Sequence, residues 1–159
     1  MTKAMKMSHS TRYLALVLIL ALGTAGCIRS PDKEYGATGE YLAVGAYLPK
    51  LLDRVVYTAQ GQNWVITPQE ENSKIAAVRA RVVNLTSTQV TLSVDEDSVT
   101  LNAKDGPNFK PFEPGMRALG TEEEAPEDNI YGAHIWGPFQ LYKNFEVAGW
   151  FFFEVPDDT

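Results

Sequence analysis

Cysteine and histidine are scarce in this chain of 159 residues, which contains one Cys and two His. A single cysteine allows neither a disulfide within the chain nor a zinc site built from several cysteines. Positive charge is also in short supply, because 14 Lys and Arg stand against 20 Asp and Glu and give a net charge of −6. An acidic chain has no general attraction to nucleic acid. These shortages exclude a disulfide-rich scaffold and argue against nucleic-acid binding.

Long apolar runs are missing as well. The unbroken run 13–22 has ten apolar residues, which as a helix would span about 15 Å of a hydrocarbon core roughly 30 Å thick. Basic residues precede this run, and the small residues 23–26 follow it. The order basic, apolar, small is the pattern of a secretory signal peptide. We therefore expect residues 1–26 to be a cleaved signal peptide and not a membrane span.

The only cysteine, Cys27, stands where a signal peptidase would cut. The sequence Thr-Ala-Gly-Cys at 24–27 resembles the lipobox of bacterial lipoproteins, although Thr24 occupies a position that is usually Leu. The resemblance implies that Cys27 becomes the first mature residue and carries acyl chains such as palmitate. Ile28 replaces the Asp of an inner-membrane retention signal, which implies the outer membrane in a bacterium with two membranes. The alternative is a secreted protein in which Cys27 is a free thiol.

Cleavage before Cys27 removes three basic residues and leaves 11 basic against 20 acidic ones, a net charge of −9. An acidic body is repelled by an anionic bilayer, so it should stand away from the membrane surface. Glycine, proline and charged residues dominate the segment that follows the cysteine, which favours a flexible tether over 27–40. The remaining residues, 41–159, are few enough for a single domain.

The body of the chain alternates with period two, as half-buried antiparallel strands do. Val78, Ala80 and Val82 share one face of such a strand, while Arg79 and Arg81 point to the other. The segment 41–50 fits either a strand or a short helix, and the proline-rich segment 107–129 should have little regular structure. This pattern predicts an all-β fold, a sandwich or a small barrel. The expected strands are 51–59, 64–67, 75–84, 88–94, 99–103, 134–141 and 147–155.

Part of this body resembles a known family. The sequence Phe-Glu-Val-Ala-Gly-Trp-Phe-Phe-Phe-Glu-Val-Pro at 145–156, the segment 78–86 and the turn 104–106 are similar to the telokin-like immunoglobulin-type domain of bacterial lipoproteins, a family of unknown function. The resemblance covers about residues 75–156. It implies an immunoglobulin-like antiparallel β-sandwich and no catalytic residues.

Members of that family usually continue past this last strand, whereas this chain stops at Thr159. We expect residues 41–59 to fill the place of the missing strand. The alternative is an open sheet edge that pairs with a strand of a partner.

Aromatic residues are the most informative remaining feature. Within the strand 147–155, Trp150 and Phe152 lie on the face opposite Phe151 and Phe153. A two-layer sandwich buries one face of a strand, so Trp150 and Phe152 need a second cover, which the segment 107–129 could supply. Otherwise they form a contact surface for an envelope protein, a glycan or a second copy. Trp136 would extend that surface, as would Tyr131, Phe139 and Tyr142.

Residues with catalytic or metal-binding chemistry are few. His134 is the only histidine after cleavage, and no Gly-x-Ser-x-Gly turn accompanies it, so we expect an ordinary strand histidine. A copper site of His134 with Met116 has no further support in the sequence. The acidic clusters 95–97 and 122–128 lack the spacing of a Ca²⁺ loop. Asn84-Leu85-Thr86 matches a glycosylation acceptor, which a bacterial lipoprotein would not use.

The sequence therefore predicts a lipid-anchored binding or structural module outside the cytoplasm, at the cell envelope, with no enzymatic activity and no cofactor. Its expected contacts are the membrane, through Cys27, and a partner at Trp150, Phe152 and Trp136. The main alternative is a lipoprotein that binds a small ligand or a metal ion, Ca²⁺ or Cu²⁺. An envelope hydrolase built from carboxylates is the second alternative.

Overall fold

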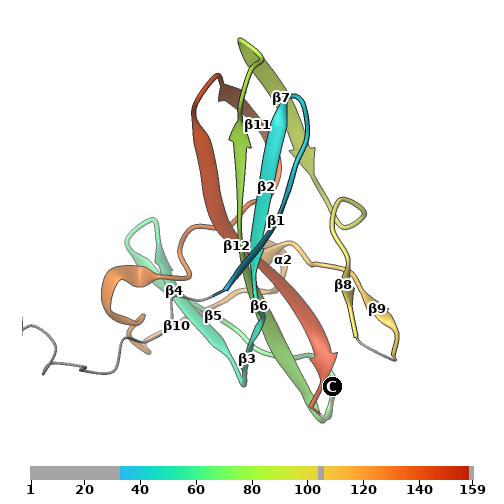
Figure 1. Cartoon of the computed structure of the whole chain (residues 1–159). Coiled ribbons are helices and arrows are strands. Elements are labelled where there is room, and N and C mark those ends of the chain that lie inside the picture. Colours follow the sequence, from blue (N-terminus) through green and yellow to red (C-terminus); the bar gives the residue numbers. More distant parts are fainter. Residues whose placement is uncertain (1–32, 104–105, 158–159) are drawn as a thin grey trace, which may run out of the picture. The chain divides into compact units, whose positions relative to one another are not determined.

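The structure is a computed structural model that describes residues 33–103 and 106–157 (Figure 1). The prediction of an all-β chain is confirmed, because the described residues form twelve strands with one short helix, α2 (Pro114–Arg117), and one 3-10 turn, η1 (Glu127–Asn129). The predicted signal peptide, the lipidation site Cys27 and the first part of the tether lie outside the described residues. Among the residues that are described, no helix is long and apolar enough to cross a membrane.

The largest sheet has two long strands at its centre, β6 (Ser73–Asn84) and β12 (Glu146–Pro156), which pair antiparallel over their whole lengths. On the other side of β6 lie β2 (Leu42–Tyr47) and β3 (Lys50–Leu52), one after the other along the same strand. Finally, β1 (Glu34–Thr38) pairs with β2 at the margin. The segment 27–40, which the sequence favours as a tether, therefore contains a strand.

Three smaller antiparallel sheets complete the fold. One has the order β10-β5-β4 and consists of β4 (Val55–Ala59), β5 (Gln62–Ile66) and β10 (Leu119–Thr121). Another pairs β7 (Gln89–Val94) with β11 (Gly137–Tyr142), and the last pairs β8 (Leu101–Asn102) with β9 (Asn108–Phe109). The predicted strand 51–59 is thus divided between β3 and β4, which belong to different sheets. The proline-rich segment contributes only β9, α2, β10 and η1, so it has little regular structure, as predicted.

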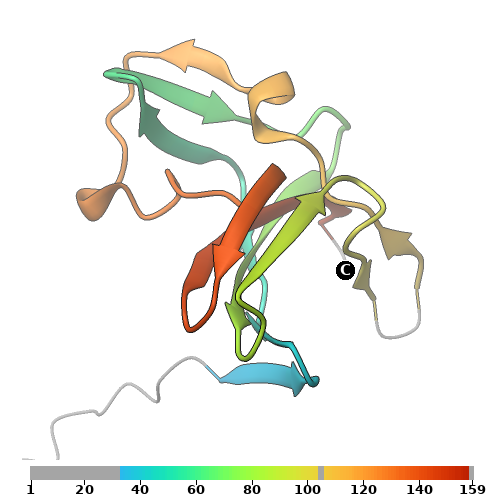
Figure 2. The same ribbon diagram turned by 90° about the horizontal axis from the view of Figure 1, so that it is seen from above.

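The central sheet has a hydrophobic core on each face. One core joins Ile75 and Ala77 of β6 to Val55, Tyr57 and Ile66 of the β4–β5 hairpin. The other core is formed by residues of the opposite faces of β6 and β12, with side chains from β7, β9 and β11 packed against it. Figure 2 shows the β4–β5–β10 sheet, in teal and light orange, set to one side of β12 and β6. The second core consists of Ala76, Ala80, Ile135, Phe151, Phe153 and Val155.

Two short segments bridge the edge of β12 that faces away from β6. The Phe112 amide donates to the Phe152 carbonyl at 3.0 Å. The Trp150 amide donates to the Ala133 carbonyl at 2.9 Å, and the Ile135 amide donates to the Trp150 carbonyl at 3.3 Å. Residues 41–59 were expected to fill this edge, but β2 and β3 pair with β6 on its opposite side and β4 pairs with β5 in another sheet. The segments around residues 112 and 134 occupy the edge instead.

Asn84 ends β6 with a fully buried side chain. Its amide group donates to the carbonyls of Ser87 at 2.7 Å and Leu141 at 2.9 Å, and its oxygen accepts the Ser87 amide at 3.1 Å. These bonds fix the turn into β7 and tie it to β11. They satisfy a polar group that would otherwise be costly to bury.

Candidate ligand pocket

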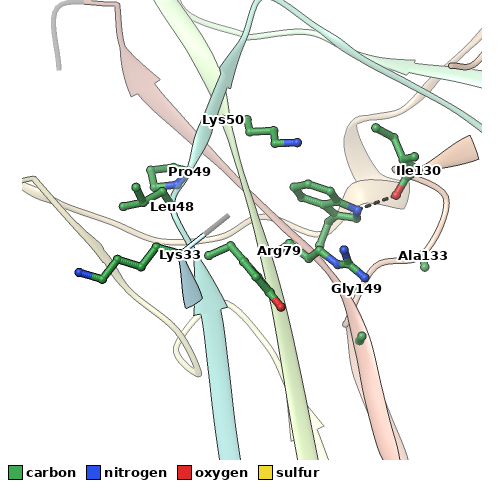
Figure 3. A pocket seen from close by; sticks show the side chains of 11 residues that line it. Lys33, Leu48, Pro49, Lys50, Arg79, Ile130, Ala133 and Gly149 are labelled. Atoms are coloured by element: carbon green, nitrogen blue, oxygen red, sulfur yellow. Dashed lines mark hydrogen bonds between the residues drawn. The ribbon is translucent and has the colours of Figure 1, made fainter. Parts of the chain in front are cut away.

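A pocket of about 430 Å³ opens on the face of the central sheet that carries Arg79 and Trp150 (Figure 3). Ligand pockets in proteins commonly have volumes of this size. The floor belongs to β6 and β12, and the walls come from the β2–β3 connection and from the segment before β11. The lining residues are Lys33, Tyr47, Leu48, Pro49, Lys50, Arg79, Ile130, Ala133, Ala148, Gly149 and Trp150.

Strand register places the main side chains of the pocket on one face. Trp150 of β12 lies directly opposite Arg79 of β6, and Lys50 of β3 lies opposite Ala77, two residues along β6. Residues two apart on a strand point to the same face. Lys50, Arg79 and Trp150 therefore all project to the side on which the pocket opens.

Trp150 is fixed as part of the pocket wall. Its indole Nε1–H donates to the Ile130 carbonyl at 2.6 Å, and its ring centroid lies 4.9 Å from that of Tyr131. Only 7% of the residue is exposed. A buried indole with a satisfied N–H is a rigid group, so this wall is formed before any ligand arrives.

The segment 133–135 packs against Gly149 so closely that no side chain would fit. A Cβ at this position would lie 2.9 Å from the Ala133 carbonyl oxygen and 3.0 Å from Ile135 Cγ1. Glycine is therefore required for the approach of the two backbones. This approach brings Ala133 to the rim of the pocket.

Positive charge in the pocket has no acidic partner among the described residues. Lys33, Lys50 and Arg79 line the pocket, and none of them forms an ion pair within residues 33–103 and 106–157. In the same part of the chain, Lys143 is the only other Lys or Arg without an ion pair. The neutralised cations are Arg54, Lys74, Arg81, Lys110 and Arg117.

Each of these three cations lies over an aromatic ring instead. Lys50 Nζ lies 5.6 Å from the centre of the Trp150 ring, and Arg79 Cζ lies 5.7 Å from that of Tyr47. Lys33 Nζ lies 4.8 Å from the Tyr35 ring centre. A cation–π contact positions a cation without cancelling its net charge. The pocket is thus positively charged in a protein whose overall charge is negative.

Arg81 shows the contrasting case on the same face of the same strand. Its guanidinium donates to both carboxylate oxygens of Glu34, at 2.6 and 3.3 Å, and to Glu146 at 3.3 Å. The hydrogen bond from Arg81 lowers the pKa of Glu34 and outweighs the opposing effect of burial. Arg79 and Arg81 are therefore a matched pair of arginines: among the described residues the first has no acidic partner and the second has two.

The structure brings together two of the three predicted contact residues. Trp150 and Phe152 belong to the same core, which Phe112 and Tyr131 also enter, and Phe152 is fully buried. Part of their cover comes from the proline-rich segment, since the Phe112 ring stacks on that of Phe152. Trp136 lies elsewhere, in an open groove with Lys110, Phe112, Met116 and Arg117.

His134 packs against aromatic residues of the first core. Its ring packs edge-on against Tyr57 at 5.3 Å, and its Nδ1 atom is buried without a hydrogen-bond partner. Burial lowers the pKa of His134, and a backbone hydrogen bond at Tyr131 opposes this only in part. Across residues 33–103 and 106–157, no three His, Cys, Asp or Glu side chains are grouped to hold a metal ion.

Sequence reasoning missed Lys50 and Arg79 as site residues. The alternation of β6 already placed Arg79 on the face of Arg81, but no sequence signal showed which of the two would meet an acid. Which arginine meets an acid depends on the register of β1, because this register places Glu34 beside Tyr47 and within reach of Arg81.

No protein-family model, no curated protein sequence and no solved structure matches this chain, so its function has to be inferred from this pocket and from the sequence.

Proposed function

We propose that this protein is a lipid-anchored binding module of the cell envelope that takes up a ligand in the pocket beside Trp150. The observation that carries the proposal is the preformed pocket with positive charges that no described acid neutralises. A cleft lined by charge of one sign attracts ligands of the opposite sign. A binding role needs no catalytic residues, and the proposal includes none.

The fold we propose for the module is the immunoglobulin-like sandwich that the family resemblance implies. Its support is the packing of the β7–β11 sheet against one face of the β6–β12 pair, with Phe151, Phe153 and Val155 between them. The β4–β5–β10 layer on the opposite face would be an addition to that sandwich.

The anchor rests on the sequence. Residues 1–26 read as an export signal, Cys27 stands at its end, and several buried acyl chains at about 0.8 kcal/mol per CH₂ would hold the module stably in a bilayer. Between Cys27 and β1 there are six residues, 28–33. Fully extended, they would span about 20 Å, which leaves the acidic body close to the membrane but not embedded in it.

Replacing the cysteine tests the anchor and the location together. In the native host, Cys27→Ala should move the protein from the detergent-requiring membrane fraction to the soluble extracytoplasmic fraction. Ser30→Ala, three residues further on, is the matched control and should leave the protein in the membrane fraction. The intact mass of the wild-type N-terminal peptide should show cleavage before residue 27 and added acyl chains. A full-length, unmodified chain in the cytosol would overturn the proposal.

A further inference from the structure

We infer that the pocket binds a phosphate monoester group attached to an apolar or sugar body, with Lys50 and Arg79 as the residues that bind the phosphate. This inference deepens the proposed binding function by naming the ligand class. It does not depend on the lipid anchor, because every residue it uses lies within the described fold.

The spacing of the two cations suits a single doubly charged group. Residues two apart on a strand are separated by about 6.7 Å, and neighbouring strands lie about 4.8 Å apart. Lys50 of β3 pairs with Ala77 of β6, and Arg79 lies two residues beyond Ala77 on β6. The backbones of Lys50 and Arg79 are therefore one strand apart across the sheet and two residues apart along it. In Figure 3 the Lys50 side chain extends toward Ile130 and the Arg79 side chain extends toward Gly149, whereas Lys33 points away from both. For this inference to hold, a phosphate group bound between Lys50 and Arg79 must contact both of them.

The chemistry of the two side chains favours phosphate over a carboxylate. The planar guanidinium of Arg79 can donate two parallel hydrogen bonds to one tetrahedral group, and the Lys50 ammonium adds a point charge. A phosphate monoester is close to doubly charged at neutral pH. Two cations without described acidic partners match its two negative charges, whereas a carboxylate would neutralise only one.

The rest of the pocket would receive the part of the ligand that carries the phosphate. Leu48, Pro49 and Ala133 give apolar wall, and Trp150 gives the edge of a fixed ring. About 430 Å³ is far more than a phosphate group alone requires. Inorganic phosphate would therefore leave most of the apolar wall in contact with water, and a larger phosphate ester would cover it.

Titration of the full-length chain, kept in a nonionic detergent, tests this inference. The probes are phenyl phosphate, inorganic phosphate and the uncharged phenyl glucoside, and the readout is the NMR signal of the Trp150 indole N–H, assigned with Trp150→Phe. Phenyl phosphate should shift this signal saturably and bind more tightly than inorganic phosphate. Phenyl glucoside should leave it unchanged. Higher ionic strength should weaken the binding.

Substitutions of Lys50, Arg79 and Arg81 provide the matched comparison. Arg79→Gln and Lys50→Gln should each raise the dissociation constant of phenyl phosphate roughly tenfold or more, the usual effect of losing one charged hydrogen-bond donor. Arg79→Lys should retain more affinity than Arg79→Gln. Arg81→Gln removes an arginine that two acids already neutralise, so it should change the dissociation constant by less than about twofold.

A further titration, with a short-chain phosphatidic acid, identifies the source of the phosphate. If dihexanoyl phosphatidic acid binds more than tenfold tighter than phenyl phosphate, the ligand is a lipid headgroup; similar affinities indicate a soluble phosphate ester. Equal binding of phenyl glucoside and phenyl phosphate would overturn the inference and leave the proposed binding function standing. An unshifted Trp150 signal with every probe, or an equal loss of affinity in Arg79→Gln and Arg81→Gln, would also overturn it. None of these results depends on the Cys27→Ala fractionation.

Discussion

His134 illustrates how burial changes the behaviour of a single residue. Its ring lies against Tyr57 at 5.3 Å and Phe152 at 6.4 Å, and its Nδ1 atom meets no hydrogen-bond partner. Charging an imidazole in such surroundings is unfavourable, so burial lowers the pKa of His134 below its ordinary value of 6.5. The unfolded chain has no such penalty. Between these two pKa values, the unfolded state therefore binds more protons than the folded state.

The consequence is a stability that rises with pH in a defined window. Above about pH 6.5 both states carry neutral His134 and no penalty exists. As the pH falls below 6.5, the unfolded state gains a proton first, and the free energy of unfolding decreases until the folded pKa is passed. Urea denaturation at a series of pH values between 5 and 8 would measure this slope.

The matched variant for this prediction is His134→Gln. It removes the titrating group while keeping a polar side chain of similar length, so the slope between pH 5 and 7 should flatten. Glu154 titrates in a separate, more acidic window: burial raises its pKa, but the Glu70 and Gln69 amides and Arg117 outweigh that effect and lower it. An unchanged slope in His134→Gln would contradict the role assigned to burial.

For His134, sequence reasoning expected an ordinary strand histidine with a satisfied hydrogen bond. In the structure His134 forms an isolated bridge with Trp150 just before β11, and its Nδ1 atom has no hydrogen-bond partner. Sequence reasoning could not assign partners to charges. Arg79 and Arg81 differ by their distance to Glu34 and Glu146, and no local pattern encodes those long-range contacts.

At the scale of the element, β12 is buried on both faces, as is its neighbour β6. Phe152 enters the core shared with the β4–β5 hairpin, while Phe151 and Phe153 enter the core beneath β7 and β11. The alternation of apolar residues on both sides of this strand already indicated that a second cover was required. The proline-rich segment 107–129 was the favoured cover. The structure assigns only Phe112 of that segment to this role, and the β4–β5 hairpin and Tyr131 supply the rest.

Substitutions along β12 and beside it test this burial. Phe152→Ala should lower the free energy of unfolding by about 3–5 kcal/mol, because it removes a fully buried ring and leaves a cavity. Phe145→Ala is the matched control. Phe145 stands just before β12 and is 65% exposed, so its loss should cost less than about 0.5 kcal/mol.

Chemical denaturation monitored by circular dichroism would give both values. A cost for Phe152→Ala close to that of Phe145→Ala would show that the hairpin does not pack on β12. It would also remove the reason for the fixed position of Trp150, whose ring packs against the same Tyr131 as Phe152.

Other elements show why strands are easier to predict than sheets. The period-two pattern located β6 and β7 to within two residues, since apolar and polar residues alternate over part of each strand. The same pattern predicted a single strand over 51–59. The chain changes sheets at Asp53 and Arg54, between β3 and β4, and this change depends on the packing of the hairpin over β6 rather than on local sequence.

For the molecule as a whole, β6 and β12 belong to both cores. Residues 33–157 lie within one compact unit, and neither core can lose its part of β12 without disturbing the other. We therefore expect the described fold to unfold in one cooperative transition. Chain length alone predicted a single domain, but the sequence did not indicate that two cores would share β6 and β12.

A variant in one core should therefore weaken the other. Phe153→Ala removes a ring from the core beneath β7 and β11, and it should reduce amide protection in the β4–β5–β10 sheet by as much as in the β7–β11 sheet. Native-state hydrogen exchange measures the two sets of amides separately. A loss of protection confined to the β7–β11 sheet would show that the layers open independently.

Asn84 has a practical consequence for producing this protein. Its side-chain amide, in the sequence Asn-Leu-Thr, gives both of its hydrogens to carbonyls inside the fold. A host that attaches glycans to such sequences could therefore reach this nitrogen only before the chain has folded. A sugar added at that moment would occupy the space in which the turn after β6 closes. Yeast or mammalian secretion would thus yield misfolded glycoprotein, whereas a bacterial host leaves the turn free to form.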